Sequence, residues 1–383
     1  MRECVIVTAK RTAIGKKGGI FASVEPEELV APLIEQVVQD CQLASHEIDD
    51  VILGNVVGPG GNIARVALLE AGLPISVPGF TVDRQCGAGL EAIQLAARLV
   101  QSGAGDIYLA GGVESTSRAP WRLARPKHIT GDPILYERAP FTPEAFGNPD
   151  MGEAAEHVAQ YYQISREKQD HFAVNSHRKA VQSQHTDHFA EEIIPICTQG
   201  EWRHKDECPR DRQNLEKLFN RMPPVFKENG SVTAANACPV NDGAAISLVM
   251  SREKCDALGL TPALRFVDAQ AAGVEPEFLG IGPVPAVQKV LARQQMDISS
   301  IDIVEFNEAF ASQTLACLET LGISEKKVNL GGGALALGHP YGASGAVLVT
   351  RLVSEMQNGT FHYGLATLGI GGGMGLAMLV ERI

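Results

Sequence analysis

The chain has 383 residues, 39 of them glycine, and a formal net charge of −12. Its 45% hydrophobic and 20% charged residues are typical of a folded globular protein and exclude an intrinsically disordered chain. The acidic total argues against a general nucleic-acid binder, which usually presents a basic face. The length predicts two or three domains, or two fused halves with an insertion.

The first segments of the chain predict a cytoplasmic α/β protein. Residues 1–7 run straight into a β-rich stretch and lack the apolar core and cleavage site of a signal peptide. No apolar window of 18 residues predicts a membrane span. Eight cysteines without a CxxC pair argue against a zinc ribbon or a disulfide framework, and no metal site is predicted.

Two parts of the sequence resemble each other. An apolar strand pattern at residues 48–55 matches one at residues 301–308. In both copies a small-residue turn, a helical pattern and a second short strand come next. This strand–helix–strand order favours a mixed or parallel sheet, and we interpret it as an internal duplication.

The middle of the chain differs from both copies. Residues 119–149 are rich in Pro, Arg and His, and two helical patterns come after them at 153–162 and 165–184, the second with Ser165 as a predicted N-cap. Residues 203–227 contain seven basic and four acidic side chains, a net +3. This stretch could attract a small polyanion, or it could be a solvated loop of mixed charge.

Cys86 is a candidate nucleophile. It stands between an extended stretch and a helical pattern, with Gly87 and Gly89 directly after it. Backbone N–H groups at a helix start favour a thiolate, and glycines let a substrate approach the backbone closely. The alternative is a small buried cysteine that happens to begin a helix.

Two further polar residues could act with that cysteine. His339, between Gly338 and Pro340, lies on a rigid turn and could take a proton from a thiol or donate to an oxyanion. Asn307 comes after the strand pattern at 301–306, at the carboxyl end where α/β sites assemble. A structural histidine and an asparagine helix cap are the alternatives.

The glycine-rich residues 369–375 suit an oxyanion hole, because five glycines in seven positions leave backbone N–H groups bare. A nucleotide-phosphate loop is the rival interpretation. No G-x-x-x-x-G-K-[ST] motif is present, and the G-x-G-x-x-A match from Gly331 runs into Pro340 where its helix should be. We therefore do not favour a dinucleotide site.

Together these motifs resemble the thiolases, the family of acetyl-CoA acetyltransferases and 3-ketoacyl-CoA thiolases. The resemblance rests on QCGAG, NEAF, GHP and the closing GIGGGMG, and it covers essentially the whole chain. It implies a five-layered αβαβα fold of two duplicated halves with an inserted loop domain. We expect the N-terminal half at residues 1–115 and 243–264, the inserted CoA-binding domain at 116–242, and the C-terminal half at 265–383.

The resemblance also implies roles for single residues. Cys86 would take the acyl group as a thioester, and His339 would activate it. His339 and a water held by Asn307 would form one oxyanion hole, and the N–H groups of Cys86 and Gly371 the other. Coenzyme A would be a substrate, with no prosthetic group. The positions similar to the family's CoA and acyl contacts are Met151, Arg210, Arg212, Phe226, Ala237, Cys238, Leu279 and Phe310.

One departure from the family concerns the second catalytic cysteine, which usually lies two residues before the oxyanion glycine. This chain has Gly369 there, and NEAF where some thiolases have HDCF. A positioned acid/base group contributes roughly 10²–10⁴-fold in rate. Its loss corresponds to on the order of 3–5 kcal/mol of barrier. Cys238 is a candidate substitute, because the family usually has serine at that position beside the pantetheine.

We therefore predict an acyl-CoA C-acyltransferase of the acetyl-CoA acetyltransferase type, active in fatty acid metabolism as a homodimer or homotetramer, with condensation impaired by Gly369. The alternatives are thioester hydrolysis, decarboxylative condensation with a malonyl donor as in the related ketoacyl synthases, and a non-catalytic acyl-CoA-binding protein. All of these share the fold and the CoA site, and they differ in the fate of the acyl group on Cys86.

Overall fold

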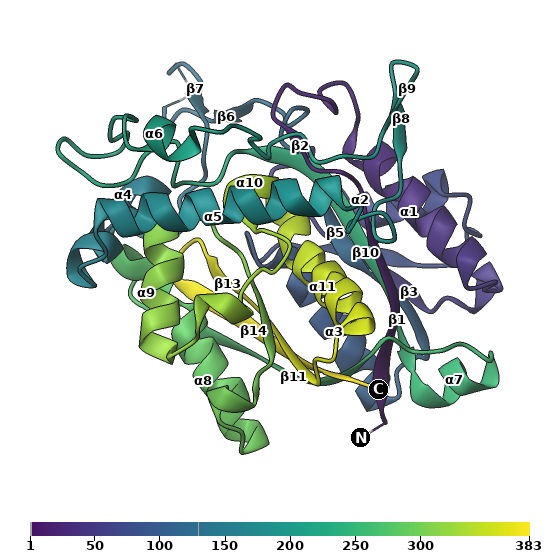
Figure 1. Cartoon of the computed structure of the whole chain (residues 1–383). Helices are drawn as coiled ribbons and strands as arrows, with labels where there is room; N and C mark the ends of the chain where they lie inside the picture. The colour runs from purple at the N-terminus through teal and green to yellow at the C-terminus, as the bar shows by residue number, and fades with distance from the viewer. Residues whose placement is uncertain (1, 129) are drawn as a thin grey trace.

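The computed structural model describes residues 2–128 and 130–383, and a mixed 10-stranded sheet runs through them (Figure 1). Strand β2 (Gly15–Lys16) pairs with β10 and lies outside the linear strand order of the sheet. Along the sheet, the order is β12 (Ile303–Phe306), β13 (Tyr363–Ile370), β14 (Met374–Arg382), β11 (Leu264–Gly273), β1 (Cys4–Arg11), β10 (Asn241–Ser251), β5 (Ile107–Ser115), β3 (Asp50–Gly54) and β4 (Gly79–Val82).

The sheet consists of two similar parts that meet at β1 and β11. Only two residue pairs join them, Val5 with Arg265 and Ile6 with Leu264. In the first part β3 runs parallel to β5, and in the second β12 runs parallel to β13. These strands lie within or next to the segments that repeat in the sequence, so the duplicated segments occupy equivalent places.

Two long helices form the middle layer between the two parts of the sheet. They are α3 (Ala88–Ser102) and α11 (Tyr341–Asn358), the helices of the two repeats. They approach closely because both carry glycine at the contact. A Cβ on Gly89 would lie 2.7 Å from the Gly342 carbonyl oxygen, and one on Gly345 would lie 2.4 Å from the Leu90 nitrogen.

Shorter helices cover the two outer faces and complete the five-layered αβαβα arrangement (Figure 1). The outer face of the first part of the sheet is covered by α1 (Pro26–Asp40) and α2 (Ile63–Glu70), and that of the second part by α8 (Pro283–Gln294), with α9 (Ala311–Leu321) beside it. Two short helices remain: α7 (Arg252–Ala257) contacts β1 and β10, and α10 (Ala334–Leu337) packs against α5 of the middle segment. The fold expected from the sequence is confirmed.

The middle of the chain forms a separate group of elements above this body (Figure 1). The expected helices are present, and Ser165 caps the second by accepting from the Lys168 N–H at 3.2 Å. These elements are β6 (Arg122–Ala124), β7 (Ile134–Tyr136), α4 (Met151–Tyr161), α5 (Arg166–His185), β8 (Ile196–Thr198), β9 (Glu201–Arg203) and α6 (Leu215–Phe219). The domain boundaries at 116 and 242 stay a prediction.

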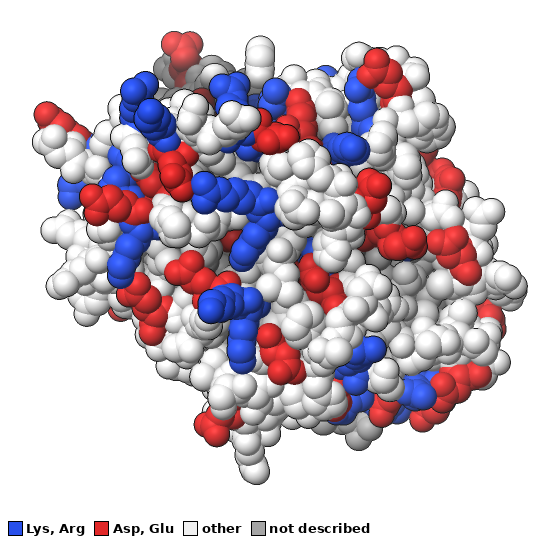
Figure 2. Space-filling model, in the orientation of Figure 1, with Lys and Arg blue, Asp and Glu red and all other residues white. Residues whose placement is uncertain are grey.

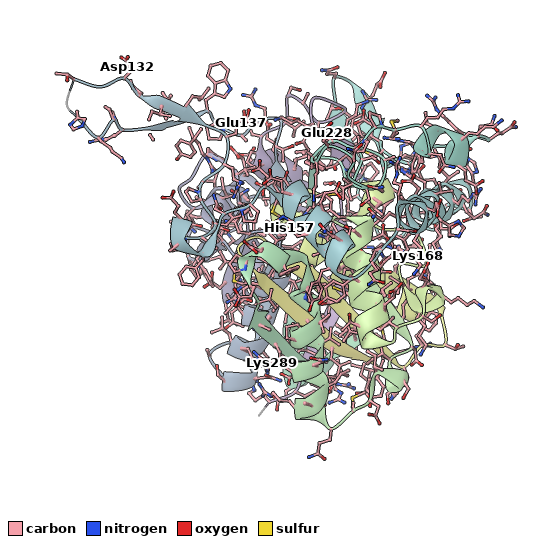
Figure 3. All side chains as sticks on the ribbon, turned by 90° about the vertical axis from the view of Figure 1, so that its left-hand side faces the viewer. Asp132, Glu137, His157, Lys168, Glu228 and Lys289 are labelled. Carbon is pink, nitrogen blue, oxygen red and sulfur yellow. The ribbon has the colours of Figure 1, made fainter. Side chains whose placement is uncertain are left out.

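The β6–β7 hairpin projects from the rest of the chain, with Asp132 near its tip and Glu137 nearer the body (Figure 3). The upper part of the face in Figure 2, around α6, carries Lys and Arg side chains mixed with Asp and Glu. In the described part of the chain, no helix combines the length and apolarity needed to cross a membrane.

Buried ion pairs tie the middle segment to both halves. The Arg11 guanidinium on β1 lies 2.7 Å from Glu192 and 2.7 Å from Asp206. Arg351 on α11 pairs with the same Glu192 and with Glu355. Removing one partner would leave a buried charge uncompensated, so these pairs fix the segment against the sheet and the central helix.

Candidate active site

Cys86 lies on the tight turn that joins β4 to α3. Gln85, just before it, has a left-handed φ of 48°, and its N–H donates to the Asp83 carboxylate at 2.7 Å. A Cβ on Gly87 would lie 2.5 Å from the tip of the Ile370 side chain, so a larger residue here would require that side chain to move. The turn thus holds the thiol between the start of α3 and the strand that leads to the glycine-rich loop.

The electrostatics of Cys86 differ from the expectation for a helix start. The N–H groups of Gly371 and of Cys86 itself act on the sulfur and favour the thiolate. Burial outweighs them and, with smaller contributions from Glu114 and Asp83, raises the pKa of Cys86 to about 11. The helix start therefore does not activate this thiol by itself, and a base is needed.

His339 is the candidate base. Its backbone N–H donates to Asn241 Oδ1 at 2.9 Å, and Gly338 before it adopts a φ of +116°. Its Nδ1 lies 2.5 Å from Ser344 Oγ, which itself donates to the Pro340 carbonyl at 2.9 Å. Because that hydroxyl proton is engaged, the network assigns the ring proton to Nδ1 and leaves Nε2 unprotonated, as an acceptor.

The imidazole is neutral at physiological pH. Burial lowers the pKa of His339 to about 4, because the charged form would lose its hydration. The ring lies edge-on to the Tyr341 ring, with a centroid separation of 5.1 Å. Burial, together with Cys238 and Cys86, raises the pKa of Tyr341, so this side chain lies near both thiols as well as against the histidine ring.

Asn307 lies beside the free nitrogen of His339. It comes directly after β12, its N–H donates to the Thr367 carbonyl at 3.1 Å, and its Nδ2 lies 3.4 Å from His339 Nε2. Helix α9 begins only at Ala311, with Phe310 as N-cap, so Asn307 is not a helix cap. The arrangement directs two polar groups, an imidazole nitrogen and an amide, toward the same place.

The NEAF segment is anchored by its glutamate. The Glu308 side chain is buried, and it accepts from Ser176 Oγ at 2.6 Å and from Asn329 Nδ2 at 2.7 Å. Ser176 lies on α5 of the middle segment. Glu308 therefore has a positioning role and holds Asn307 between α5 and the loop before α10.

The glycine-rich loop connects β13 to β14 and faces Cys86. Gly372 and Gly373 form the turn with φ of 86° and 82°, which is why side-chain-bearing residues are disfavoured there. The Gly371 N–H is directed at the Cys86 sulfur. One residue outside the expected motifs, Phe141, closes over this loop, since a Cβ on Gly371 would lie 2.8 Å from its ring.

Most of the expected CoA and acyl contacts gather in one cluster. Phe310 pairs with Ala237 in an isolated β-bridge, and its ring lies 6.1 Å from that of Phe226. Met151 and Ala237 pack against the same cluster. The Cys238 N–H donates to the Ala309 carbonyl at 2.9 Å. Leu279 is buried in the 3₁₀ helix Pro276–Ile281, which packs against α4.

The two arginines lie elsewhere in the middle segment. The Arg210 guanidinium packs over the Phe219 ring at 5.5 Å, and its backbone N–H donates to His177 Nδ1 at 3.2 Å. Arg212 is exposed. Because Arg212 is exposed and the Arg210 guanidinium packs on a ring, Arg212 is the more accessible of the two to a phosphate.

The sequence alone assigns no role to three side chains at this site: Ser344, Glu114 and Gln313. Glu114 is buried and accepts from Asn55 Nδ2 at 3.0 Å and from the Gly342 N–H at 2.9 Å. Burial raises its pKa to about 7. Ser344 could have been found as a hydroxyl one helical turn after Pro340, whereas nothing in the sequence marks Glu114 or Gln313.

The comparisons with known proteins concern the family and the fold. Residues 4–253 match the family model "Thiolase, N-terminal domain", and residues 260–382 match "Thiolase, C-terminal domain". The chain is 49% identical over 384 residues to "Putative acetyl-CoA C-acetyltransferase VraB" of Staphylococcus aureus strain MW2, covering 100% of both chains. The Staphylococcus epidermidis protein of that name is also 49% identical, with 100% of this chain and 99% of that protein covered. A crystal structure of the Bacillus anthracis acetyl-CoA acetyltransferase superposes with a TM-score of 0.94 at 37% identity, covering 100% of this chain and 99% of that one.

Proposed function

Because the chain belongs to the thiolase family, we propose that it is an acyl-CoA C-acyltransferase of the acetyl-CoA acetyltransferase type that works through a Cys86 thioester. One observation carries the proposal. The Gly371 N–H meets the Cys86 sulfur, Asn307 meets His339, and Tyr341 connects the two pairs, because its ring contacts that of His339 and its phenol lies near enough to Cys86 for their charges to interact.

The first half-reaction uses the free imidazole nitrogen. His339 Nε2 takes the Cys86 thiol proton as the sulfur attacks the acyl-CoA carbonyl. The negative oxygen that forms is stabilised by the N–H groups of Cys86 and Gly371. When the carbon–sulfur bond to CoA breaks, His339 returns the proton to the departing thiolate. Acyl-Cys86 and free CoA result.

The second half-reaction forms a carbon–carbon bond. The α-carbon of a second acyl-CoA loses a proton and attacks the carbonyl of acyl-Cys86. The bond from that carbonyl to the Cys86 sulfur breaks, and the cysteine leaves as a thiolate that recovers a proton. The oxygen of the second thioester carries the charge that develops as the α-proton leaves. A water held by Asn307, and His339 when its Nε2 carries a proton, are proposed to stabilise this oxygen. Loss of the α-proton requires an acceptor, and Gly369 offers none. We therefore propose that transfer to plain acetyl-CoA is slow.

Cys238 is the proposed acceptor within the chain. Its thiol lies near enough to Cys86 for the two charges to interact. Burial raises the pKa of Cys238, so its thiolate is scarce at neutral pH. This makes Cys238 a weak substitute for a dedicated second cysteine.

The cluster of Met151, Phe226, Ala237, Cys238 and Phe310 is proposed to line the pantetheine and acyl end of CoA, with Leu279 limiting the acyl chain. Arg212, with Arg210, is proposed to meet the adenosine phosphates. We also propose a homodimer or homotetramer, a cytoplasmic location and a role in fatty acid metabolism, as expected from the sequence.

The test is cleavage of acetoacetyl-CoA by CoA. Wild type, Cys86→Ala and Asn307→Ala are compared by loss of substrate and by appearance of acetyl-CoA. Measurable cleavage that disappears in Cys86→Ala and weakens in Asn307→Ala supports the transferase. Free acetoacetate released from CoA would indicate a hydrolase instead. Binding of acyl-CoA without any turnover or acyl-enzyme would leave only a binding protein.

A further inference from the structure

The glycine-rich turn that carries the Gly371 N–H has no side chains of its own to hold it. Gly371, Gly372 and Gly373 follow one another, and the last two adopt φ of 86° and 82°. Glycine loses more conformational freedom on folding than any other residue, so such a turn keeps one conformation only where its neighbours hold it. Because the Gly371 N–H meets the Cys86 sulfur, the position of this turn affects the reaction site.

Two segments from outside the turn contact it. The Val274 N–H donates to the Gly373 carbonyl at 2.7 Å. Phe141 of the middle segment covers Gly371, where a Cβ would lie 2.8 Å from Cε2 and 3.0 Å from Cδ2 of its ring. The Phe141 carbonyl oxygen would also lie 3.2 Å from a Cβ on Gly372. The Phe141 ring therefore occupies the space that a side chain on Gly371 would need.

Arg138 holds Phe141 in this place. The segment starts beside Glu137, near the point where the β6–β7 hairpin joins the body (Figure 3). The Arg138 guanidinium lies over the Phe141 ring, 4.5 Å from its centroid, and donates to Asn148 Oδ1 at 3.0 Å. The same Oδ1 accepts from the Phe141 N–H at 3.1 Å. Both the ring and the backbone of Phe141 are thus fixed.

The same guanidinium reaches the start of α4. It donates to the Pro149 carbonyl at 3.4 Å and lies 3.3 Å from Asp150, the N-cap of α4. Met151, the first residue of α4, is one of the side chains proposed to line the CoA site. Arg138 therefore connects the glycine-rich turn, through Phe141, with the part of the middle segment proposed to hold the substrate.

Resting on the proposed function, we propose that Phe141 is a positioning residue for acylation, whose ring holds Gly371 so that its N–H stays directed at Cys86. The N–H then meets the oxyanion without rearranging when the thiol attacks the acyl-CoA carbonyl. Without the ring, the three glycines gain conformations in which this donor points away from the sulfur. The ring acts on the free enzyme as well, so the role differs from substrate contact.

The experiment measures single-turnover acylation of Cys86 by acetyl-CoA over a range of concentrations. We expect Phe141→Ala to lower the maximal rate about 10- to 100-fold, since misplacing a group by about 1 Å can cost roughly 10²-fold. The half-saturating concentration of acetyl-CoA should not change. Phe141→Leu should recover most of the loss, because leucine still packs on Gly371. Phe146→Ala is the matched control from the same segment, and with Phe146 64% exposed it should acylate like wild type.

A double variant tests whether Phe141 acts through Gly371. Gly371→Ala alone should lower the rate, because its methyl group would meet the Phe141 ring at 2.8 Å. In Phe141→Ala that methyl group has room, and the φ of Gly371 is outside the left-handed region, so alanine fits the backbone and limits its freedom. The double variant should therefore be no slower than Phe141→Ala, whereas independent effects would multiply.

The outcomes are distinct. Phe141 lies outside the hydrophobic core, so its variants should fold, which thermal unfolding checks. Wild-type acylation by Phe141→Ala, or multiplied losses in the double variant, would overturn the inference. A raised half-saturating concentration at an unchanged maximal rate would also overturn it and make Phe141 a substrate contact. A wild type that never acylates Cys86 would instead refute the proposed function.

Discussion

Replacing Ser344 with alanine tests how the histidine is held. In the folded chain Ser344 Oγ accepts from the protonated Nδ1 of His339 at 2.5 Å and donates to the Pro340 carbonyl at 2.9 Å. Alanine removes the contact that assigns the ring proton to Nδ1. The Nδ1–H then loses its acceptor in a buried place, and the tautomer with a protonated Nε2 gains population.

The magnitude comes from the cost of an unpaired buried donor, about 1–3 kcal/mol. If that cost appears fully in the barrier to acylation, the rate falls about 5- to 150-fold at 1.36 kcal/mol per tenfold. Binding of acyl-CoA should change little, because Ser344 lies behind the imidazole. The loss should therefore appear in kcat rather than in KM.

The assay is single-turnover acylation of Cys86 by acetyl-CoA, quenched at set times and read by mass spectrometry. Ser354→Ala is a matched control on the same helix, because Ser354 is buried and the described chain offers its hydroxyl no hydrogen-bond partner. The control should acylate at the wild-type rate. Equal rates for Ser344→Ala and Ser354→Ala would refute the reasoning about the tautomer.

The same contacts support three further predictions. If Cys238 supplies the missing proton transfer, Cys238→Ser should slow condensation and thiolysis roughly 10²- to 10⁴-fold, and unchanged rates would dismiss it as the acid/base group. Burial raises the pKa of Cys86 to about 11. The rate at which iodoacetamide alkylates this thiol, measured by peptide mapping, should therefore rise about tenfold per pH unit from pH 7 to 10. A rate that levels off near pH 8 would contradict the raised pKa. Burial, and then Arg210, lower the pKa of His177 to about 4, whereas an unfolded histidine titrates near 6.5. The unfolded state therefore binds a proton that the folded state does not. Because of this, the free energy of unfolding should decrease by up to about 1.4 kcal/mol for each pH unit as pH falls from about 6.5 toward 4. Urea titrations of wild type and His177→Gln should differ in pH dependence by that amount, and parallel curves would count against a neutral buried His177.

Much of the fold was predictable because both copies of the duplicated segment show the apolar spacing of the strand and the helix that they form. The strands at β3 and β12 and the helices α3 and α11 each have an apolar pattern of the right period, with small residues at the turn. This apolar pattern could not show why the residues at the turns are small. Gly89 and Gly345 are needed where two helices from distant parts of the chain touch, and no local signal reports such a contact.

The site was predictable only where side-chain type implies chemistry. A cysteine before glycines and a histidine before proline are visible as candidates in a sequence, but the pKa of Cys86 is set by burial, which reversed the expected effect of the helix start.

The most direct test of the central claim is the covalent state of Cys86 after mixing the protein with acetyl-CoA. The protein is quenched in acid, digested and mapped by mass spectrometry, with Cys86→Ala as control. The account predicts one acetyl group per chain, on the peptide that contains Cys86, and its removal when CoA is added back. An unmodified Cys86, or an acetyl group on Cys238 that persists in Cys86→Ala, would contradict it.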